Sequence, residues 1–272
     1  MSSDFNTYFY NKNYSIRYFY IEKYFRKHCH HLKWNPEETV LDIGSGTGDV
    51  CRKFIFPILP NDLKCYVRSD VSAKMLNEAK GVFKNNPKVS FWLLDITAEI
   101  EVKTRLKYDH IISINTFMWI SDQLNAFKNV YELLKPGGGC FLMFLSKCNF
   151  VATILDLVRR PRWKSFYPNP ELIYPFPYMT DPDPVRTVTD MMTTIGFSNI
   201  NVYLEKTSFA FRTEDEYLGF FRAVPHSMAL MTPEEQQDFQ KEALGLAHNY
   251  RIINESGQTD NYSSYLVVYA EK

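Results

Sequence analysis

Three glycines at alternate positions form the pattern with the clearest chemical meaning in the chain. Gly44, Gly46 and Gly48 follow directly after the mostly apolar run Val40–Ile43. A glycine turn lets a ligand approach bare backbone because no Cβ intervenes. A helix that begins after such a turn offers unpaired N–H groups and the positive end of its dipole. The pattern therefore predicts a site for a nucleotide-like cofactor.

The spacing of the glycines argues against a cofactor held by its phosphates. It differs from the G-x-G-x-x-G of dinucleotide sites, and no Lys-Ser or Lys-Thr pair follows as in a P-loop. Asp49 stands directly after the last glycine, where it would repel a pyrophosphate. Asp42 lies at the end of the first expected strand, where a carboxylate suits a cationic or amine-bearing ligand.

Two more carboxylates stand at the ends of the next two apolar runs. Asp70 is placed to accept hydrogen bonds from both hydroxyls of a ribose. Asp95 follows Val89–Leu94 and is placed to accept from the amino group of an adenine. A ribose, an adenine and a cationic group beside Asp42, without any phosphate, together describe S-adenosylmethionine (SAM).

Each of these features also has an ordinary structural explanation. A lone G-x-G-x-G is often a plain tight turn. Asp70 alone can be an acid at a helix start, with Ser72 as the helix cap. Asp95 alone can be a loop carboxylate. Their joint occurrence in an alternation of strands and helices favours the cofactor site.

Several segments together resemble class I SAM-dependent methyltransferases. These segments are residues 40–48, 69–72, 94–96 and 134–139, the last with the Lys-Pro-Gly-Gly turn that usually precedes the fifth strand. Residues 108–113, 119–123, 126–129 and 196–200 are similar to insect juvenile hormone acid methyltransferases, and the likeness covers most of residues 8–270. The resemblance implies a cofactor site made by Asp42, Gly44, Ser45, Gly46, Gly48, Asp70, Val71, Asp95, Ile96 and Asn115.

The methyl acceptor is expected beyond the fourth strand, because ligands of open α/β sheets lie at the carboxyl ends of the strands. The segment Asn115–Trp119 would then face the methyl group, and the resemblance implies that Trp119 holds a substrate carboxylate. A buried core tryptophan is the alternative. Met118 stands where the family has a histidine, and Arg17 falls where it has a carboxylate-binding glutamine.

Arg17 is the residue found by counting back without gaps from Trp34. An arginine can hold a carboxylate by two parallel hydrogen bonds, so acid recognition would survive in an altered form. The alternative is a solvated residue on a helix surface. With Trp119 and Met118, Arg17 completes the predicted acceptor site.

A carboxylate acceptor would ask little of the protein. It is already ionised at neutral pH, so positioning and desolvation suffice and no general base is needed. His110 falls inside an expected strand, and the sequence shows no obvious base near Trp119. This favours an apolar small-molecule acid, such as a terpenoid or fatty acid. The alternatives are a hydroxyl acceptor or a non-catalytic relative that binds SAM or an apolar ligand.

The elements that must position these residues predict one α/β domain over residues 1–272, with a Rossmann-like, doubly wound sheet of seven strands. Strands are expected at 38–43, 64–69, 89–94, 108–114, 139–145, 199–211 and 263–271, the last inserted antiparallel. Helices are expected at 14–31, 47–57, 72–84, 121–134, 149–159, 183–195, 213–223 and 232–250. The aromatic segment 5–32 is expected as a lid helix, or as simple packing, and 146–180 as an inserted aromatic cap.

Composition narrows the partners and the compartment. The 272 residues carry no net charge, which gives no electrostatic footprint for nucleic acid or an anionic membrane. Five unpatterned cysteines, no signal peptide and no run of transmembrane length predict free thiols in the cytosol. The spacing in His28-x-His30-His31 converges poorly on a metal, so none is expected. The oligomeric state stays open.

Overall fold

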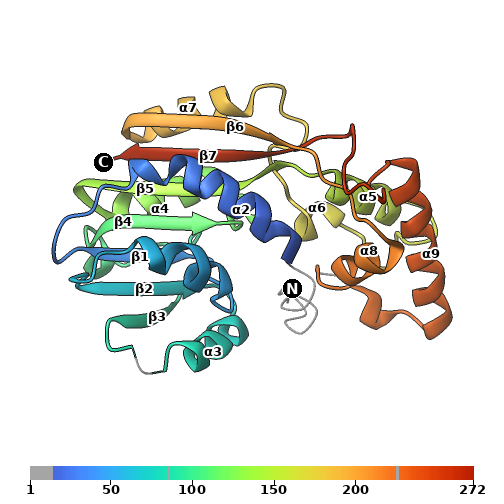
Figure 1. Ribbon diagram of the computed structural model, residues 1–272, viewed down its shortest axis with the longest axis horizontal. Helices are drawn as coiled ribbons and strands as arrows, with labels where there is room; N and C mark the ends of the chain where they lie inside the picture. Colours follow the sequence, from blue (N-terminus) through green and yellow to red (C-terminus); the bar gives the residue numbers. More distant parts are fainter. Residues whose placement is uncertain (1–14, 85, 225–226) are drawn as a thin grey trace.

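The computed structural model describes residues 15–84, 86–224 and 227–272 (Figure 1). Within these residues a sheet of seven strands runs in the order β3-β2-β1-β4-β5-β7-β6. The strands are β1 (Thr39–Ile43), β2 (Cys65–Asp70), β3 (Val89–Leu93), β4 (Tyr108–Ile114), β5 (Leu134–Lys147), β6 (Ser198–Thr207) and β7 (Ser263–Glu271). Strands β1 to β5 pair in parallel, and β7 is antiparallel to both β5 and β6. The predicted doubly wound sheet is confirmed.

The helices are α2 (Ser15–His28), α3 (Ala73–Val82), α4 (Gln123–Leu133), α5 (Asn149–Val158), α6 (Pro170–Ile173), α7 (Pro184–Ile195), α8 (Glu214–Phe221) and α9 (Pro233–Asn249). An α-helix lies at every range where the sequence predicts one except 47–57, and the short α6 is an addition that the sequence did not predict. Local signals explain the agreement: Ser72, Asp122 and Asp183 accept a hydrogen bond from the first turn of α3, α4 and α7. Gly196, at a φ of 114°, ends α7 in the left-handed conformation.

Three expected elements differ from the structure. The strand expected over 199–211 ends at Thr207, and Phe211 forms only an isolated bridge with Ile253. The helix expected over 47–57 begins at Asp49 and consists of a π-helical turn η2 (Cys51–Ile55) followed by a 3₁₀ turn η3 (Phe56–Ile58). Strand β5 begins at Leu134, so the expected Lys-Pro-Gly-Gly loop is the irregular start of the strand. One hydrogen-bond partner of this segment is distant in sequence, because the Gly137 N–H donates to the Lys272 carbonyl at 2.9 Å.

Helix α2 lies across one face of the sheet (Figure 1). The Tyr24 hydroxyl donates to the Lys206 carbonyl at 2.7 Å, and the Phe25 ring meets the Phe141 ring edge-on, with centroids 5.5 Å apart. Ile21, Tyr24 and Phe25 are buried. The described part of the aromatic segment therefore packs on the sheet. Residues 5–14 of the expected lid lie outside the described residues.

The cap is larger than the expected segment 146–180. Helices α5 and α6 follow β5, whereas α8 and α9 connect β6 to β7, and all four gather at one end of the sheet (Figure 1). Aromatic rings join the two groups: Trp163 meets Phe239 at 5.0 Å, and Phe150 meets Phe220 at 4.8 Å between centroids. We use "cap" below for residues 146–180 together with 208–262.

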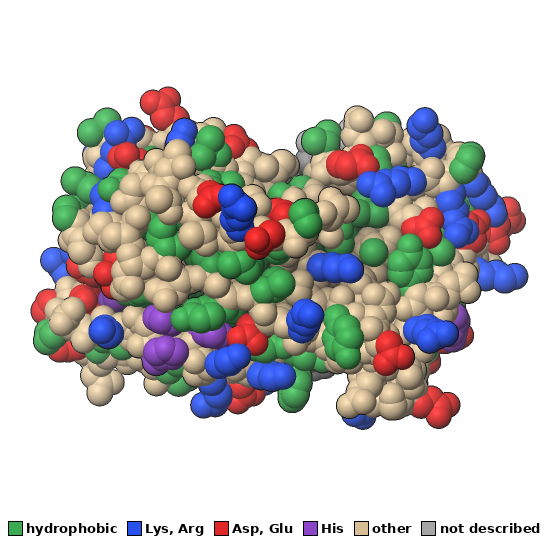
Figure 2. Space-filling view, turned by 90° about the horizontal axis from the view of Figure 1, so that it is seen from above, with side chains coloured by type: hydrophobic (Ala, Val, Ile, Leu, Met, Phe, Trp, Pro, Cys, Tyr) green, Lys and Arg blue, Asp and Glu red, His purple; other side chains and the backbone are tan. Residues whose placement is uncertain are grey.

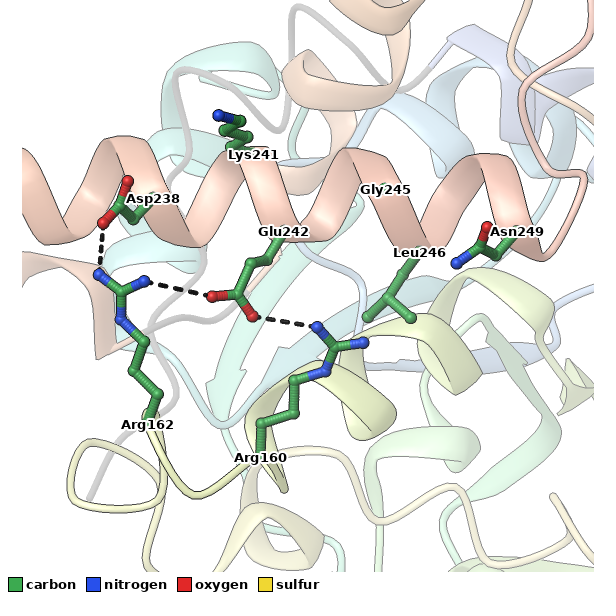
Figure 3. A pocket seen from close by; sticks show the side chains of 8 residues that line it. All are labelled: Arg160, Arg162, Asp238, Lys241, Glu242, Gly245, Leu246 and Asn249. Carbon is green, nitrogen blue, oxygen red and sulfur yellow. Dashed lines mark hydrogen bonds and ion pairs between the residues drawn. The ribbon is translucent and has the colours of Figure 1, made fainter.

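A charged cluster on the outer side of the cap also joins these two segments (Figure 3). Glu242 on α9 accepts from Arg160, Arg162 and the indole N–H of Trp163 at 3.1–3.4 Å. Arg162 also pairs with Asp238. The surface hollow between these side chains contains none of the predicted site residues. The cluster therefore fastens the cap and lies apart from the glycine turn.

The surface intersperses acidic and basic side chains over the face seen in Figure 2. Salt bridges such as Lys27–Glu205 and Arg159–Glu171 pair opposite charges. None of the helices formed by the described residues has the length and apolar character needed to cross a membrane.

Candidate functional site

The glycine turn (residues 44–48) depends on glycine for its backbone shape and for close packing. Gly44, Gly46 and Gly48 have φ angles of 68°, 55° and 105°, which side-chain-bearing residues rarely adopt. A Cβ on Gly44 would lie 2.0 Å from Oγ1 of Thr116. The turn after β1 therefore rests directly on the segment that follows β4. This contact occurs where the strand order reverses, the usual ligand position in such sheets.

A buried arginine holds the glycine turn from inside the protein. Arg68, on β2, is fully buried, and its Nη2 donates to the carbonyls of Ser45 at 2.7 Å and Gly46 at 3.4 Å. Its guanidinium lies 4.7 Å from the centre of the Phe83 ring. A Cβ on Gly48 would be 2.4 Å from Nη1 of Arg68, so this glycine makes room for the arginine.

Sequence analysis missed Arg68. The available signal was its position two residues before Asp70 in an otherwise apolar run, which puts both side chains on one face of the strand. A lone charged residue in a strand usually faces solvent, so the sequence did not indicate that Arg68 is buried and holds the turn.

Asp70 joins the end of β2 to the glycine turn. Its two oxygens accept from the N–H groups of Gly46 and Ser72, each at 2.9 Å. Each oxygen keeps further lone-pair capacity, so a pair of ribose hydroxyls can still bind. Burial raises the pKa of Asp70, against the opposing effect of these two N–H donors. Val71, directly after it, is 70% exposed and offers an apolar surface beside the carboxylate.

Asp95 and Ile96 follow β3 at the same end of the sheet. The Leu94 N–H donates to the Asp70 carbonyl at 3.1 Å, which ties this segment to the end of β2. Asp95 is exposed, and its Oδ1 accepts from the N–H and hydroxyl of Thr97 at 2.9 and 2.7 Å. Ile96 is buried. An exposed carboxylate beside an apolar side chain fits the predicted adenine position.

Asp42 lies deeper than its predicted role suggests. Its side chain is 3% exposed and accepts a hydrogen bond from the Tyr66 hydroxyl at 2.9 Å. The Tyr66 hydroxyl in turn accepts from the Cys51 thiol at 3.1 Å. Burial raises the pKa of Asp42 to about 6, although the nearby Arg68 charge opposes this shift. The carboxylate therefore supports the site from within. A direct contact with a cationic ligand stays a prediction.

Two buried polar atoms of the predicted cofactor residues have no hydrogen-bond partner among the described residues: Oγ of Ser45 and Oδ1 of Asn115. The same holds for Nε and Nη1 of Arg68 beneath the turn. Buried polar atoms are nearly always satisfied, so each exception needs an explanation. Asn115 directly follows β4 and has a φ of 60°; its N–H donates to the Met143 carbonyl at 2.7 Å. Ser45 and Asn115 belong to the predicted cofactor site, and a polar cofactor would satisfy them. The residues present therefore fit SAM.

The predicted acceptor residues lie on a short turn that the cap touches. We call residues 115–119 the acceptor turn; it contains the 3₁₀ turn η5 (Phe117–Trp119). The Met118 side chain is buried, and its carbonyl accepts from the Phe176 N–H at 3.0 Å. Trp119 is partly buried, with its ring edge-on to Phe176 at 5.2 Å. Trp119 thus lies between the sheet and the cap.

Arg17 lies on α2, and its side chain is outside the described residues, so its role stays a prediction. The contacts of the next residue, Tyr18, show what lies near the backbone of Arg17. The Tyr18 hydroxyl donates to Oδ2 of Asp49 at 2.8 Å, and Asp49 directly follows the glycine turn. This part of α2 therefore adjoins the predicted cofactor site.

The histidines of the described chain have other partners. His110 is buried within β4, as expected, and its Nε2 lies 3.0 Å from a Glu38 oxygen. His28 pairs with Glu205 at 2.7 Å, and His31 lies 3.1 Å from the Tyr203 hydroxyl. In the parts of the chain that the structure describes, no three His, Cys, Asp or Glu side chains are grouped to hold a metal.

The chain is similar in sequence to known methyltransferases. Residues 41–140 match the family model of a methyltransferase domain. A juvenile hormone acid O-methyltransferase of Drosophila melanogaster is 29% identical over 66% of this chain and 61% of its own length. The Bombyx mori protein of the same name is 25% identical over 84% of this chain and 81% of its own.

The fold also resembles solved structures. A Haemonchus contortus phosphoethanolamine N-methyltransferase in complex with S-adenosyl-L-methionine superposes with a TM-score of 0.52 and 16% identity. The superposition covers 89% of this chain and 50% of that one. At this identity the likeness is one of fold alone.

Proposed function

We propose that this chain, which has the fold of class I methyltransferases and a segment that matches the methyltransferase-domain family, is a SAM-dependent enzyme that methylates the carboxylate of an apolar small-molecule acid. The observation that carries the proposal is Trp119, which lies at the carboxyl end of β4 between the glycine-turn side and an aromatic cap. Relatives named for methylating a hormone acid support the same acceptor class.

The proposal assigns each predicted residue a part in binding. Bound SAM would supply a methyl group that its sulfonium already activates. Asp70 would hold the ribose, and Asp95 with the Ile96 backbone the adenine. The methionine part would be held by Gly44, Ser45, Gly46 and Gly48, with Asp42 beneath and Asn115 and Val71 beside the ligand.

On the acceptor side, Trp119 and Arg17 would hold the carboxylate, with Met118 packed beside it. An acid of this kind is ionised at neutral pH, so these residues need to orient it and to keep water away. Cap side chains such as Tyr174 and Phe176 are buried beside Trp119 and supply an apolar surface for the rest of the substrate. The exclusion of water strengthens the contacts to the carboxylate.

We also propose a cytosolic location. All five cysteines are free thiols, which supports a reducing compartment.

The decisive experiment measures methyl transfer from labelled SAM to sesquiterpenoid acids and medium-chain fatty acids, with the matching alcohols as controls. The proposal expects methyl esters from acids and no product from alcohols. Transfer to the alcohols instead would identify a hydroxyl acceptor. Retained SAM binding without any transfer would overturn the acid acceptor and favour a binding role.

A matched pair of variants tests the carboxylate contact. Arg17→Gln restores the residue type of the family and should keep acid methylation, whereas Arg17→Met should raise the KM for the acid about tenfold or more, the scale of a lost charge-assisted hydrogen bond. Equal KM values in both variants and the wild type would show that Arg17 is a surface residue.

A further inference from the structure

A buried glutamine uses both N–H groups of its side-chain amide to hold the backbone around Trp119. Gln123, the first residue of α4, is 6% exposed. Its Nε2 donates to the carbonyls of Phe117 at 2.9 Å and Ile120 at 2.7 Å. These carbonyls lie on either side of Trp119, so one side chain spans the backbone that presents the indole.

The remaining polar atom of Gln123 reaches the cap. Its Oε1 accepts from the Tyr178 hydroxyl at 3.0 Å. Tyr178 is 3% exposed, and burial raises its pKa, so the hydroxyl stays protonated and donates. The bond is made between two buried groups, where an unpaired partner is costly.

The acceptor turn has few bonds of its own. Trp119 N–H donates to the Thr116 carbonyl at 2.8 Å, and Ile120 N–H to the Phe117 carbonyl at 3.2 Å. Its other neighbours are β5, whose Met143 carbonyl accepts from the Asn115 N–H, the glycine turn, which Thr116 touches at Gly44, and the cap. The position of Trp119 relative to the cofactor side therefore depends on how the turn is held from outside.

We propose that Gln123 and Tyr178 form a positioning pair that sets the place of Trp119 for methyl transfer and seats the cap on the acceptor turn. The part played by Trp119 rests on the proposed function. The bonds from Gln123 to the Phe117 and Ile120 carbonyls, by contrast, are observed and do not depend on that function. Neither member of the pair touches the reacting atoms, so both act through the turn.

The chain provides a matched control for Tyr178. Tyr167 is a second buried tyrosine of the cap, and its hydroxyl accepts from the Ser227 N–H at 3.0 Å. Tyr178→Phe and Tyr167→Phe remove the same atom from the same part of the molecule. Only the first removes a bond to Gln123, which holds the acceptor turn. A general loss of cap packing would affect both variants alike.

The first measurement is amide hydrogen exchange in the free proteins, which needs no substrate. The Trp119 and Ile120 amides should exchange about tenfold faster in Tyr178→Phe and at the wild-type rate in Tyr167→Phe. Gln123→Met removes all three bonds of the glutamine and should accelerate them further. Equal exchange in both tyrosine variants would overturn the positioning pair.

The second measurement is kinetic and separates positioning from stability. With the best acid of the panel, Tyr178→Phe should lower kcat about tenfold and leave the SAM Kd within twofold of wild type. In a Trp119→Phe background the same change should have no further effect, because it acts through the indole. Additive losses would overturn this route.

The outcome also distinguishes the two proposals. If no acid yields an ester with the wild-type protein, the acceptor class is wrong, and amide exchange still decides on the positioning pair. If acids are methylated but Tyr178→Phe behaves like Tyr167→Phe in both measurements, the acceptor class stands and the pair is wrong.

Discussion

The carboxylates near the ends of β1, β2 and β3 meet three different environments. Asp42 is buried against Tyr66, Asp70 bridges the glycine turn to α3, and Asp95 is exposed. We predict that Asp70, which is partly exposed, and Asp95, which is exposed, accept hydrogen bonds from the ligand, whereas Asp42 is buried. Asp42 instead supports the glycine turn from the protein interior, beside Tyr66 and Arg68.

Asp70→Ala should weaken SAM binding by about 1.5–3 kcal/mol, the scale of hydrogen bonds to a charged group. The change removes the predicted ribose acceptors and leaves the Gly46 N–H without its carboxylate. Isothermal titration with SAM measures the loss. Asp183→Ala is the control, because Asp183 also accepts from a helix N–H, at the start of α7. Unchanged affinity in Asp70→Ala would refute the ribose role.

Asp42 should make the stability of the ligand-free protein fall as the pH rises from about 4 to about 6. Its pKa is about 6 in the folded state, against 3.8 for an ordinary Asp, so the folded state binds the extra proton in this interval. Ionisation above it costs the folded state up to about 3 kcal/mol.

Asp42→Asn tests this directly, because the amide oxygen can still accept from Tyr66 and no charge has to be buried. Urea unfolding should show the variant more stable than wild type above pH 6, with the difference vanishing below pH 4. A difference that stays constant across this range would contradict the assignment.

At the scale of elements, the glycine turn and the acceptor turn form one unit because they touch at Gly44 and Thr116. Both are short connections with special backbone angles, Gly44 at a φ of 68° and Asn115 at 60°. Neither is stable by itself, and each is fixed by neighbours: Arg68 for the first and Gln123 for the second. A substitution that separates them should disturb cofactor and acceptor binding together.

Two glycine variants compare the tightly packed glycine turn with the open surface of α3. Gly44→Ala combines a positive φ with a Cβ placed 2.0 Å from Thr116, and should lower the free energy of unfolding by about 2 kcal/mol or more. Gly81→Ala meets nothing within 4 Å on α3 and should raise it by about 0.5–1 kcal/mol. Thermal unfolding of both compares them. A stabilised Gly44→Ala protein would show that the turn has room for a Cβ.

Sequence patterns predicted the elements whose causes are local. The capping residue Ser72 and the terminating Gly196 identify helix ends because their partners lie within a few residues. The early start of β5 was missed because its partner, Lys272, lies at the other end of the described chain. The same reason explains why the sequence did not reveal Arg68 or the pair of Gln123 and Tyr178. Their roles depend on contacts with residues far away in the sequence, between strands, turns and the cap.

At the scale of the whole molecule, the cap is made from two insertions in the chain order of the sheet. One follows β5 and the other connects β6 to β7. The second was missed as part of the cap because its helices look like ordinary covering helices in sequence. Their aromatic residues, such as Phe220 and Phe239, become informative only when they meet Phe150 and Trp163.

This interleaving predicts a single cooperative unfolding transition, in line with the one domain expected over residues 1–272. The cap cannot detach without moving the strands that carry it. Urea unfolding followed by far-ultraviolet circular dichroism and by tryptophan fluorescence should give superimposable curves, because Trp163 reports on the cap and Trp92 on the sheet. Two separated transitions would show that the cap is an independent unit.

The position of β7 has a consequence for how the chain is made. The strand lies between β5 and β6, although it follows both in the sequence. While the ribosome is still synthesising α8 and α9, β5 and β6 are already present, and each exposes a row of unpaired backbone groups. Open strand edges recruit neighbouring chains, and partly synthesised chains are prone to aggregate. For this fold, the interval before the last strand emerges is the period in which a molecular chaperone matters most.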